Sequence, residues 1–560
     1  MPTLDWIGKK AVVNHHREVP YRLVHCDGEL SAGDPDAANL LVQGDNLEAL
    51  KALLPYYAGK VKCIYIDPPY NTGNEGWVYN DNVASPEIKA WLGKVVGKEA
   101  EDLSRHDKWL CMMYPRLRLL REFLREDGVI AVSISETEIN NLKMMMTEVF
   151  GEQNFVAEVI VESNTRGQTY KAIARTHEYC LIFSKSDAAE LSEISDLDRA
   201  FPFSDNRGGY ELWELRNRNP RFNRENRPNL YFPLYADPEP FQHDHHRVGL
   251  TRTHPDQIEV YPVDGNGNDD CWRWSENLIK TKELGGESPD LIARQTRSGK
   301  WTVWQRARKK TKSAKSIFRG SEYLNEAGTT LLSSMGMRGE FDHPKPIGLL
   351  RTIIELATDE EDIVLDSFAG SGTTGHAVLD LNRAGNGNRQ FILVEMDQQI
   401  ASNVTAKRLK IAIQGYDKGG DPKKPVEGLG GGYRYCRLGT PLFNEFGDIH
   451  EAVSFPDLAA HVFFSETGAP LPKKVDGSTP LIGQHKNKIV YLLFSPAEQG
   501  FPREAAGNVL TPDALASLPS APEGFDGERV VYAEGCTVSS ERLKAEGVVF
   551  KQIPYQIEGA

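Results

Sequence analysis

The sequence has few cysteines, no CxxC pair and no long apolar run. Its seven cysteines are scattered over 560 residues, which argues against a disulfide framework or a zinc ribbon and predicts reduced, structural thiols. No stretch of 18 apolar residues occurs, and the first twenty residues lack the apolar core of a secretory signal. We therefore expect neither a membrane-spanning helix nor export, but a soluble, cytoplasmic protein without a membrane partner.

Positive charge is scarce overall but concentrated in the centre of the chain. The formal net charge is −14, which alone would disfavour a polyanionic partner. However, residues 291–320 hold ten Lys or Arg and no acid, and residues 207–231 hold six Arg against three Glu. Residues 441–560 carry nine basic and sixteen acidic side chains. Because local charge decides whether phosphates are attracted, we expect the basic centre to bind a polyanion.

Apolar and amphipathic segments alternate on both sides of this centre. Helices are expected in the second half of 39–54, over 114–127 and over 347–357. Buried strands are expected at the start of 39–54 and at 61–66, 128–134, 155–162, 178–184, 362–366 and 390–397. Such alternation predicts a doubly wound α/β sheet. Between about 190 and 335 the alternation is lost and Asn, Pro, Arg and Gly accumulate, which predicts an inserted module.

A glycine-rich turn stands in the sequence VLDSFAGSGTTGHA (364–377). A strand, a glycine turn and a helix let backbone N–H groups approach a nucleotide-like ligand. A Walker loop is excluded, because His-Ala replaces its Lys and Ser/Thr. The spacing of Gly370, Gly372 and Gly375 fits GxGxxG, and Glu395 is placed to hold ribose hydroxyls. The pattern predicts an adenosine-containing cofactor and leaves NAD and S-adenosylmethionine open.

A second constellation, Asp67-Pro68-Pro69-Tyr70, follows the strand expected at 61–66. An exocyclic amino group on a heteroaromatic ring is a weak nucleophile because its lone pair is delocalised. The Asp67 carboxylate and the Pro68 carbonyl can each accept one N–H of such a group and free the lone pair. Tyr70 offers a face on which a base turned out of a duplex can stack. The tetrapeptide predicts chemistry on an exocyclic amine.

These motifs resemble those of a known enzyme family. IYIDPPYNTG (64–73), DSFAGSGTT (366–374) and FILVEMD (391–397) are similar to the signatures of S-adenosylmethionine-dependent amino-group DNA methyltransferases, in the circularly permuted order of the beta class. The resemblance covers roughly residues 40–410 and is greatest to the modification subunit of type III restriction-modification systems. Ser367 stands where the family often has proline. The last 150 residues resemble nothing that we can name.

The resemblance implies a role for each motif residue. Asp67, Pro68, Pro69 and Tyr70 would bind and activate the target base. The residues implied at the S-adenosylmethionine site are Asp45 near the adenine, Asp67, Lys345 in the segment FDHPKP (341–346), Asp366 at the end of its strand, Phe368, Gly370, Gly372 and Glu395.

The resemblance also implies the reaction. A methyl group would pass from S-adenosylmethionine to N6 of a flipped adenine in double-stranded DNA, within a restriction-modification or related defence system. N4 of cytosine presents the same amino chemistry, and a catalytically idle DNA-recognition subunit is the alternative from another class. No metal and no catalytic cysteine are expected. Because the chain has no Walker or nuclease motif, DNA cleavage would need a separate helicase–nuclease subunit. Whether such a partner or a homodimer exists stays open.

The expected architecture is an α/β, doubly wound, Rossmann-like methyltransferase sheet, circularly permuted and interrupted by a target-recognition insert. The expected boundaries are an N-terminal extension (1–38), the catalytic half of the core (39–190), the insert (191–335), the cofactor half (336–415), a linker (416–440) and a C-terminal α/β or α+β domain (441–560).

Sequence specificity is expected in the insert, since the core must hold its motifs fixed. Its long basic side chains can contact phosphates or guanine edges. The DNA contacts expected there are Arg294, Arg297, Arg306, Arg308, Lys309, Lys310 and Lys312. Histidines 243, 245, 246 and 254 fit no standard zinc spacing with Cys271, and these histidines are expected to be exposed loop residues.

Overall fold

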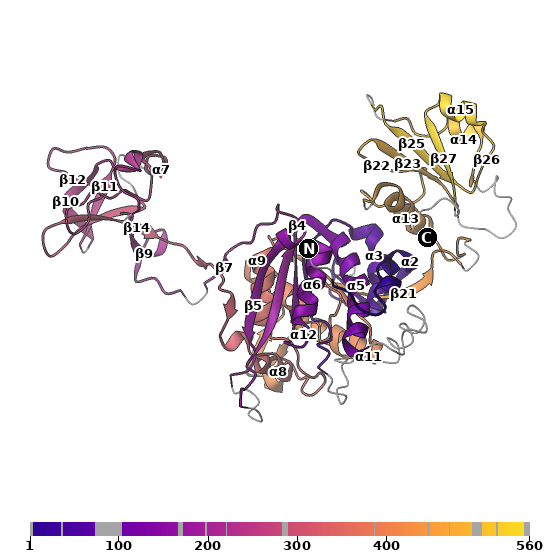
Figure 1. The fold of residues 1–560 in the computed structure, drawn as a ribbon, viewed down its shortest axis with the longest axis horizontal. Helices are drawn as coiled ribbons and strands as arrows, with labels where there is room; N and C mark the ends of the chain where they lie inside the picture. The colour runs from indigo at the N-terminus through magenta and orange to yellow at the C-terminus, as the bar shows by residue number, and fades with distance from the viewer. Residues whose placement is uncertain are drawn as a thin grey trace. The chain divides into compact units, whose positions relative to one another are not determined.

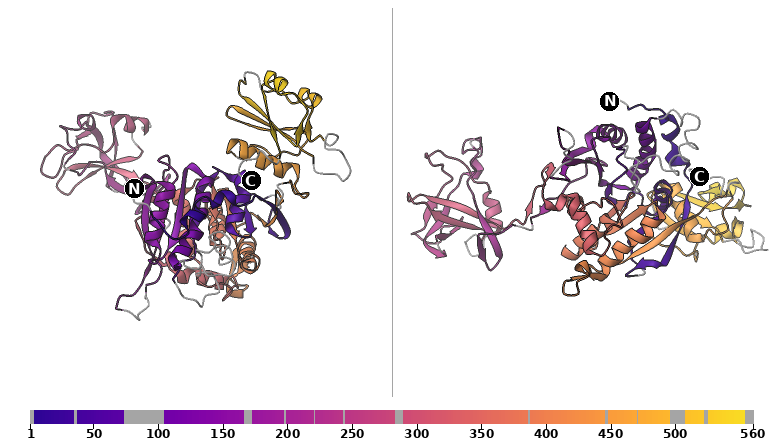
Figure 2. Two further views of the ribbon diagram at one scale, coloured as in Figure 1. Left: turned by 45° about the vertical axis from the view of Figure 1, so that its right-hand side comes forward. Right: turned by 90° about the horizontal axis from the view of Figure 1, so that it is seen from below.

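The computed structural model divides the chain into two compact units (Figures 1 and 2). Unit 1 combines Met1–Glu193 with Ala314–Ala560, and unit 2 is Ile194–Ser313. The structure describes residues 4–34, 37–72, 104–165, 172–196, 199–219, 221–242, 244–282, 289–385, 387–444, 448–469, 471–495, 507–521 and 525–553.

Unit 1 is built on a ten-stranded sheet in the order β1-β21-β2-β18-β17-β3-β4-β6-β5-β16, as far as the described residues go. β2, β18, β17, β3 and β4 run parallel, and β6 is antiparallel to β4. The strands are β1 (Arg22–Ala32), β2 (Leu40–Gln43), β3 (Val61–Ile66), β4 (Leu124–Ile134), β5 (Phe155–Glu162), β6 (His177–Ser184), β16 (Ile317–Phe318), β17 (Ile363–Asp366), β18 (Gln390–Glu395) and β21 (Tyr433–Pro441).

Helices cover both faces of this sheet, so the expected doubly wound α/β architecture is confirmed (Figure 1). One face packs in a single apolar cluster against α3 (Asn46–Tyr57), α5 (Arg105–Phe123) and α6 (Ile139–Phe150). The other face carries α9 (Ile347–Ala357), α10 (Thr373–Gly385) and α12 (Ala406–Gln414). α5 ends at Phe123, earlier than expected, because Leu124 already pairs with Val61 of β3. Unit 1 also contains α1 (Lys9–Val12), α2 (His15–Glu18), α8 (Asn325–Ser334) and α11 (Gln398–Ile400).

Two segments expected outside the core contribute strands to its edge. β1 lies within the expected N-terminal extension, and β21 begins within the expected linker and pairs with both β1 and β2. Glycine serves close packing here rather than flexibility. A Cβ added at Gly432 would lie 2.4 Å from Asp34 N, and one at Gly33 would lie 2.1 Å from Gly431 O. Before β21, β19 (Gly415–Asp417) pairs with β20 (Pro425–Glu427).

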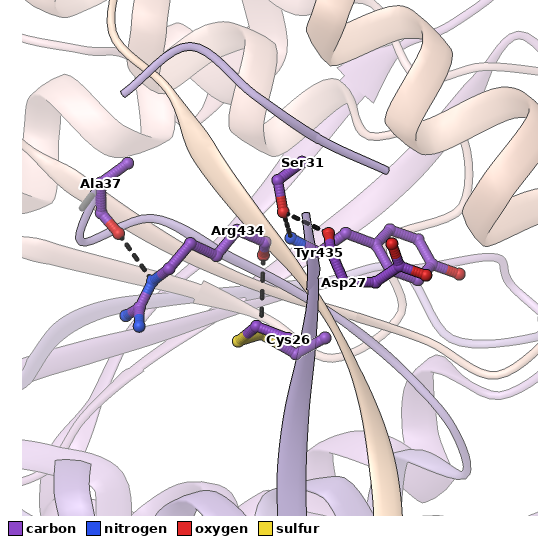
Figure 3. Close-up of a disulfide and its surroundings, with 7 residues drawn as sticks. Cys26, Asp27, Ser31, Ala37, Arg434 and Tyr435 are labelled. Atoms are coloured by element: carbon purple, nitrogen blue, oxygen red, sulfur yellow. Dashed lines mark hydrogen bonds between the residues drawn. A yellow bond between two sulfur atoms is a disulfide. The ribbon is translucent and has the colours of Figure 1, made fainter. Parts of the chain in front are cut away.

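Pairing of β1 with β21 also corrects the prediction for the cysteines. Cys26 and Cys436 face each other across the two strands and form a disulfide (Figure 3). The expectation of reduced thiols is therefore wrong for this pair, because strand register brings together residues 410 positions apart. The cysteines at 63, 111, 180, 271 and 536 are free thiols.

The C-terminal part of unit 1 is a small α/β layer of its own. Its strands run in the order β22-β23-β25-β27, with β23, β25 and β27 parallel. An apolar cluster joins it to Tyr21 and Leu23 of the N-terminal segment. Its elements are α13 (Phe455–Thr467), β22 (Leu481–His485), β23 (Lys488–Leu493), β24 (Val509–Leu510), α14 (Pro512–Ala516), β25 (Glu528–Ala533), β26 (Gly535–Cys536), α15 (Ser540–Ala545) and β27 (Val548–Gln552).

Unit 2 is a seven-stranded antiparallel sheet in the order β12-β10-β11-β13-β14-β9-β8, again within the described residues. Trp272, 1% exposed, lies in its apolar core. Its elements are β7 (Ile194–Ser195), β8 (Phe203–Asp205), β9 (Gly208–Glu214), β10 (Leu234–Gln242), β11 (His245–Gly249), β12 (Ile258–Val260), α7 (Glu276–Lys282), β13 (Leu291–Gln295), β14 (Trp301–Ala307) and β15 (Thr311–Lys312), the last paired with β7.

Two histidines of unit 2 differ from the expectation of exposed loop residues. His245 and His246 lie on β11 and are buried. His245 packs against Phe203 and Tyr210, and His246 packs edge-on against Trp301. His243 lies outside the described residues. The described residues hold no group of three or more His, Cys, Asp or Glu that could bind a metal, and no helix among them is long and apolar enough to cross a membrane.

Candidate active site

The strands that carry the two sequence motifs are neighbours at the centre of the main sheet. β17 pairs in parallel with β3, although some 300 residues separate them in the chain. From β17 the sheet continues through β18 and β2 on one side, and from β3 through β4 on the other. Ligands of doubly wound sheets bind at the carboxyl ends of strands where the strand order reverses in this way. Asp366 and Asp67 stand at those ends.

A cavity of about 1050 Å³ opens at this edge. The glycine turn lines one side of it and the Asp-Pro-Pro-Tyr loop the other. The sequence-predicted residues that line it are Asp67, Pro68, Pro69, Tyr70, Lys345, Asp366, Phe368, Gly370 and Glu395. Asn46, Arg116, His177, Glu178, Asn325 and His343 line it as well, and no role was expected for them.

The glycine turn between β17 and α10 needs glycine for conformation and for packing. Gly370 and Gly372 adopt φ values of 50° and 77°, a region that side chains disfavour. A Cβ at Gly372 would lie 2.9 Å from Thr405 Cγ2. A Cβ at Gly375 would lie 2.9 Å from Leu409 Cδ2 and 3.0 Å from Leu393 Cδ1. The GxGxxG spacing therefore reflects a tight turn followed by close packing of α10 against α12 and the sheet.

Two buried carboxylates hold this turn in place. Asp366 accepts hydrogen bonds from Phe368 N, at 2.9 Å, and from Thr374 Oγ1. Glu395, at the end of β18, accepts one from Gly370 N at 2.8 Å and lines the cavity. Burial raises the pKa of Asp366 to about 7. Asp366 thus supports the turn from beneath, and Glu395 combines support with access to a ligand.

A cluster of five polar side chains surrounds the end of β3. Lys345 Nζ lies 3.4 Å from Asp67 Oδ1 and 2.5 Å from Glu178 Oε2. Tyr70 OH donates to Glu178 Oε2 at 2.8 Å, and Lys345 Nζ donates to Tyr70 OH. Asn325 Nδ2 donates to the other Glu178 oxygen at 3.0 Å. The cluster joins the Asp-Pro-Pro-Tyr loop, β6, the start of α8 and the segment before α9.

Burial and charge oppose each other within this cluster. Burial raises the pKa of Asp67, and the neighbouring Lys345 ammonium limits that rise. Burial would also raise the pKa of Glu178, but the charge and hydrogen bond of Lys345, with the bonds from Asn325 and Tyr70, lower it to about 2. Lys345 keeps its proton, since the two carboxylates outweigh its own burial and raise its pKa. The cluster thus holds one ammonium between two carboxylates.

The loop after β3 is held from the opposite side. Trp109 Nε1, on α5, donates to Pro69 O at 2.7 Å. Asn71, with φ of 57°, donates through Nδ2 to Glu138 Oε1 and to Arg105 O. Glu138 is fully buried. The Pro69 carbonyl is thus engaged by Trp109, and Pro68 lines the cavity.

Asp45, which the resemblance implies near the cofactor adenine, lies next to the cavity lining. It caps α3, accepting from Leu47 N and Glu48 N, and it is absent from the described lining of the cavity. The next residue, Asn46, lines the cavity and donates to Ser367 O at 3.2 Å. Arg116 is hydrogen-bonded to the side chains of both Asp45 and Asn46. Asp45 therefore contacts the cavity lining through Arg116.

A buried arginine lies behind the glycine turn. Arg408, on α12, is 0% exposed and donates to Ser371 Oγ at 2.8 Å and Thr373 Oγ1 at 2.7 Å. It also contacts His376 Nδ1 at 3.3 Å. Burial lowers the pKa of Arg408 to about 9 and that of His376 to about 3. No sequence motif pointed to Arg408, because its role depends on the docking of α12 under the turn.

The basic residues expected to contact DNA are largely paired with acids of unit 2. Arg306 and Arg308 both bind Asp205, and their side chains are only 12% and 19% exposed. Arg294 is paired with Asp244 and Lys312 with Asp196. The remaining three, Arg297, Lys309 and Lys310, are exposed. The run of positive charge that looks uncompensated along the chain is therefore partly neutralised in space.

Comparison with known proteins identifies the family. A family model described as DNA methylase matches residues 61–407. The chain belongs to this DNA methylase family. The EcoPI Mod subunit of a type III restriction-modification enzyme from Escherichia phage P1 is 33% identical to this chain, over 73% of this chain and 65% of the Mod subunit. The type II methyltransferase M.KpnI from Klebsiella pneumoniae is 31% identical, over 66% of this chain and 83% of its own.

Solved structures resemble this DNA methylase only distantly. The M1.HpyAVI–SAM complex is 14% identical, over 66% of this chain and 98% of its own, with a TM-score of 0.29. The PvuII DNA methyltransferase, described as cytosine-N4-specific, is 12% identical, over 66% of this chain and 86% of its own, with a TM-score of 0.32. At this level of similarity, the solved structures give no information on the fold beyond the strand order described above.

Proposed function

We propose that this DNA methylase transfers a methyl group from S-adenosylmethionine to N6 of adenine in double-stranded DNA. The observation that carries the proposal is a single cavity that holds both the glycine turn with Glu395 and the Asp67-Pro68-Pro69-Tyr70 loop. One half suits an adenosine-containing cofactor and the other an exocyclic amine. The relatives named Mod subunits and M.KpnI support the same class of reaction.

The cavity residues fit S-adenosylmethionine. Glu395 presents a buried carboxylate to a ribose diol, and Phe368 offers an aromatic face beside the backbone N–H groups of the glycine turn. Asn46 lines the same cavity and adds a polar contact. When bound there, the cofactor supplies an electrophilic methyl group on a sulfonium.

The residues of the catalytic loop would prepare the amine. Asp67 and the Pro68 carbonyl accept its two N–H bonds, which draws the nitrogen towards tetrahedral geometry and frees its lone pair. Tyr70 stacks against the flipped base. The Lys345 ammonium opposes the rise that burial causes in the pKa of Asp67 and so favours its ionised form. Direct transfer from sulfonium to nitrogen would release S-adenosylhomocysteine and one proton of the amino group, so no covalent enzyme intermediate would be needed.

The proposal also includes the order of the two motifs, the role of unit 2 and a partner subunit. The motif strand β3 precedes β17 in the chain, which supports the circularly permuted order of the beta class. Unit 2 interrupts unit 1 between the two motifs, which supports its role as the target-recognition module. The Mod relatives support a place in a restriction-modification system, with a separate helicase–nuclease subunit as partner.

Nucleoside analysis of methylated DNA tests the proposed reaction. The protein is incubated with duplex DNA and S-adenosylmethionine carrying a labelled methyl group, and the DNA is digested and analysed by mass spectrometry. Labelled N6-methyldeoxyadenosine is expected. Labelled N4-methyldeoxycytidine would change the target base, and absence of label despite cofactor binding would identify a catalytically idle subunit.

The variant Asp67→Ala tests the catalytic assignment. It should abolish labelling while leaving the affinity for S-adenosylmethionine, measured by calorimetry, within about threefold of wild type, since Glu395 and the glycine turn remain. Asp417→Ala, at an exposed position on β19, is the control and should retain full activity. Retained labelling in Asp67→Ala would refute the role of Asp67.

A further inference from the structure

The loop between β9 and β10 is rich in arginine, and hydrogen bonds hold its backbone. Residues 216–231 contain five arginines and one glutamate. Unit 2 as a whole is nearly neutral, with 20 Lys or Arg and 18 Asp or Glu over residues 194–313, whereas the rest of the chain has 45 and 61. This arginine loop was not among the expected DNA contacts, which were all placed between residues 294 and 312.

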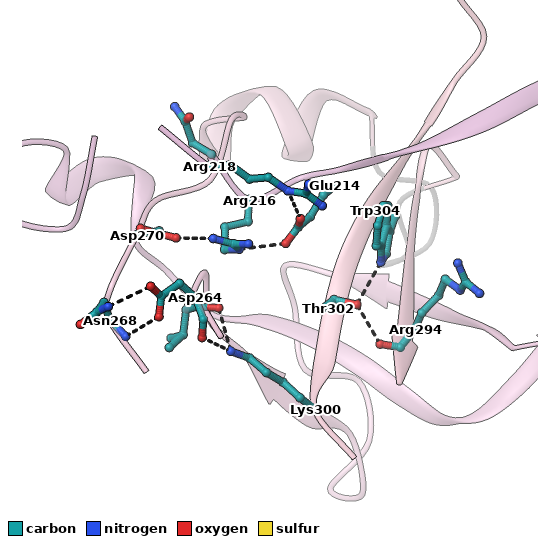
Figure 4. Close-up of polar contacts among 12 residues, drawn as sticks. Glu214, Arg216, Arg218, Asp264, Asn268, Asp270, Arg294, Lys300, Thr302 and Trp304 are labelled. Atoms are coloured by element: carbon teal, nitrogen blue, oxygen red, sulfur yellow. Dashed lines mark hydrogen bonds and ion pairs between the residues drawn. The ribbon is translucent and has the colours of Figure 1, made fainter. Parts of the chain in front are cut away.

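Both ends of the arginine loop are fixed to one buried segment. Asn217 N donates to Cys271 O at 2.9 Å, and Trp272 N donates to Leu230 O at 2.7 Å. The Trp272 indole also donates to Phe232 O at 2.8 Å. Arg216, at the base of the loop, bridges Glu214 and Asp270 (Figure 4). The loop is therefore anchored in the core of unit 2.

Asparagine side chains hold the loop backbone internally. Asn219 N donates to Asn217 Oδ1, and Arg221 N donates to Asn219 Oδ1, both at 3.1 Å. Asn223 and Asn226 cap each other's backbone N–H groups, at 3.2 and 3.0 Å. Asn226 Nδ2 donates to Arg221 O at 2.6 Å. These hydrogen bonds shape the loop, and four of its arginines are exposed along it together with Glu225 and Asn226.

The arginines recur every third residue, at 218, 221, 224 and 227, and all four are exposed. Arg218 and Arg224 pair with Glu214 and Asp269, yet their side chains remain 69% and 59% exposed. Arg224 lies 4.6 Å from the Tyr231 ring centroid, and Arg227 lies 5.3 Å from that of Phe222. Stacking on an aromatic ring fixes the plane of a guanidinium and leaves its N–H edge available.

We infer that the arginine loop, residues 216–231, is the surface of unit 2 that docks on the phosphate backbone of duplex DNA. This inference rests on the proposed function. It makes the arginine loop the main contact with DNA phosphates, in place of the basic run, residues 291–320. Arg306 and Arg308 of that run are largely covered by their shared partner Asp205, whereas the loop presents four exposed guanidinium groups on a preformed frame. A preformed cationic surface binds phosphates without the entropic cost of ordering a loop.

Two matched double variants test the inference in the full chain. Arg221→Gln/Arg227→Gln removes two exposed charges from the loop, and Arg297→Gln/Lys310→Gln removes two from the basic run. None of the four residues forms an ion pair within the described part of the chain, so neither variant breaks one. Duplex affinity is measured by fluorescence anisotropy between 50 and 200 mM salt, conditions chosen because phosphate contacts make affinity steeply salt-dependent.

The loop variant should bind duplex about tenfold more weakly and show a salt slope smaller by about two, because two fewer phosphates are neutralised. Arg221→Lys/Arg227→Lys, which keeps the charge, should bind within about threefold of wild type. The basic-run variant should change less than the loop variant. Thermal unfolding and S-adenosylmethionine binding should be unchanged in all variants.

The inference is overturned if the loop variant binds duplex with wild-type affinity and salt slope, in which case the loop faces an acidic protein or solvent. It is also overturned if the affinity of the basic-run variant falls as much as that of the loop variant or more. A wild-type protein that neither binds nor methylates duplex DNA would instead contradict the proposed function, so the two failures are distinguishable.

Discussion

At the residue scale, the structure places Glu178, which was not expected from the sequence, beside the residues expected to be catalytic. It sits at the start of β6 and contacts Lys345, Tyr70 and Asn325. A buried carboxylate that pairs with an ammonium beside a second carboxylate sets the balance of charge around that second group. Glu178 is therefore a positioning residue for Asp67, acting through Lys345 and Tyr70.

This arrangement predicts opposite shifts of the acid limb of the pH–activity profile. Activity needs ionised Asp67, so it should fall as pH drops through the pKa of that carboxyl. Lys345→Met removes the positive charge that lowers this pKa and should move the limb to higher pH. Glu178→Gln removes a negative charge that raises the same pKa and should move the limb to lower pH.

The check is kcat/KM for labelled methyl transfer across pH, with bound S-adenosylmethionine measured in parallel. A merely structural role for Glu178 would reduce activity equally at every pH. Shifts of both variants in the same direction would contradict the balance of one ammonium against two carboxylates. Asn325→Ala, which removes only one hydrogen bond to Glu178, should shift the limb less than either.

At the scale of elements, the glycine-rich stretch before β21 illustrates how composition can mislead. Glycine in a sequence favours the expectation of a flexible linker, since the residue is conformationally permissive. Here glycine instead lets the backbone before β21 approach that of residues 33 and 34, so that β21 reaches its place between β1 and β2.

Gly432→Ala should therefore destabilise the protein. The added Cβ would lie 2.4 Å from Asp34 N, and backbone must shift to relieve the contact, at a cost of about 2 kcal/mol. Thermal unfolding followed by circular dichroism measures the effect. Gly385→Ala at the end of α10 is the control, since no atom lies within 4 Å of its added Cβ. Equal stability of the two variants would show that this edge tolerates displacement.

At the scale of the whole molecule, the chain separates its chemistry from its proposed recognition of sequence. Within the described part of the chain, the residues that line the cavity, from Asn46 to Asp397, all belong to unit 1. Unit 2 has its own sheet and its own apolar core. Such a division lets recognition vary while the relation between Asp67 and the glycine turn stays fixed.

Exchange of residues 194–313 with the matching segment of a relative that methylates another site should transfer that relative's specificity. Methylated positions are mapped by single-molecule sequencing. The chimera should retain S-adenosylmethionine binding, because the cavity is unchanged. An active chimera that keeps the original site would place recognition elsewhere, with the C-terminal layer as the next candidate.

The sequence by itself determined the α/β class, most strands of the main sheet and both motifs, because these depend on local periodicity and on residue types next to one another. β5 and α9 match their expected ranges, and Asp67, Lys345 and Glu395 all line one cavity. Only the tertiary structure decided which distant residues meet. Strand register paired Cys26 with Cys436, and the approach of β6 placed Glu178 beside Lys345. Folding also brought Asp205 to Arg306 and Arg308, so charge that is concentrated along the chain is neutralised in space. Such pairings depend on the register and packing of separate segments, which no local pattern encodes.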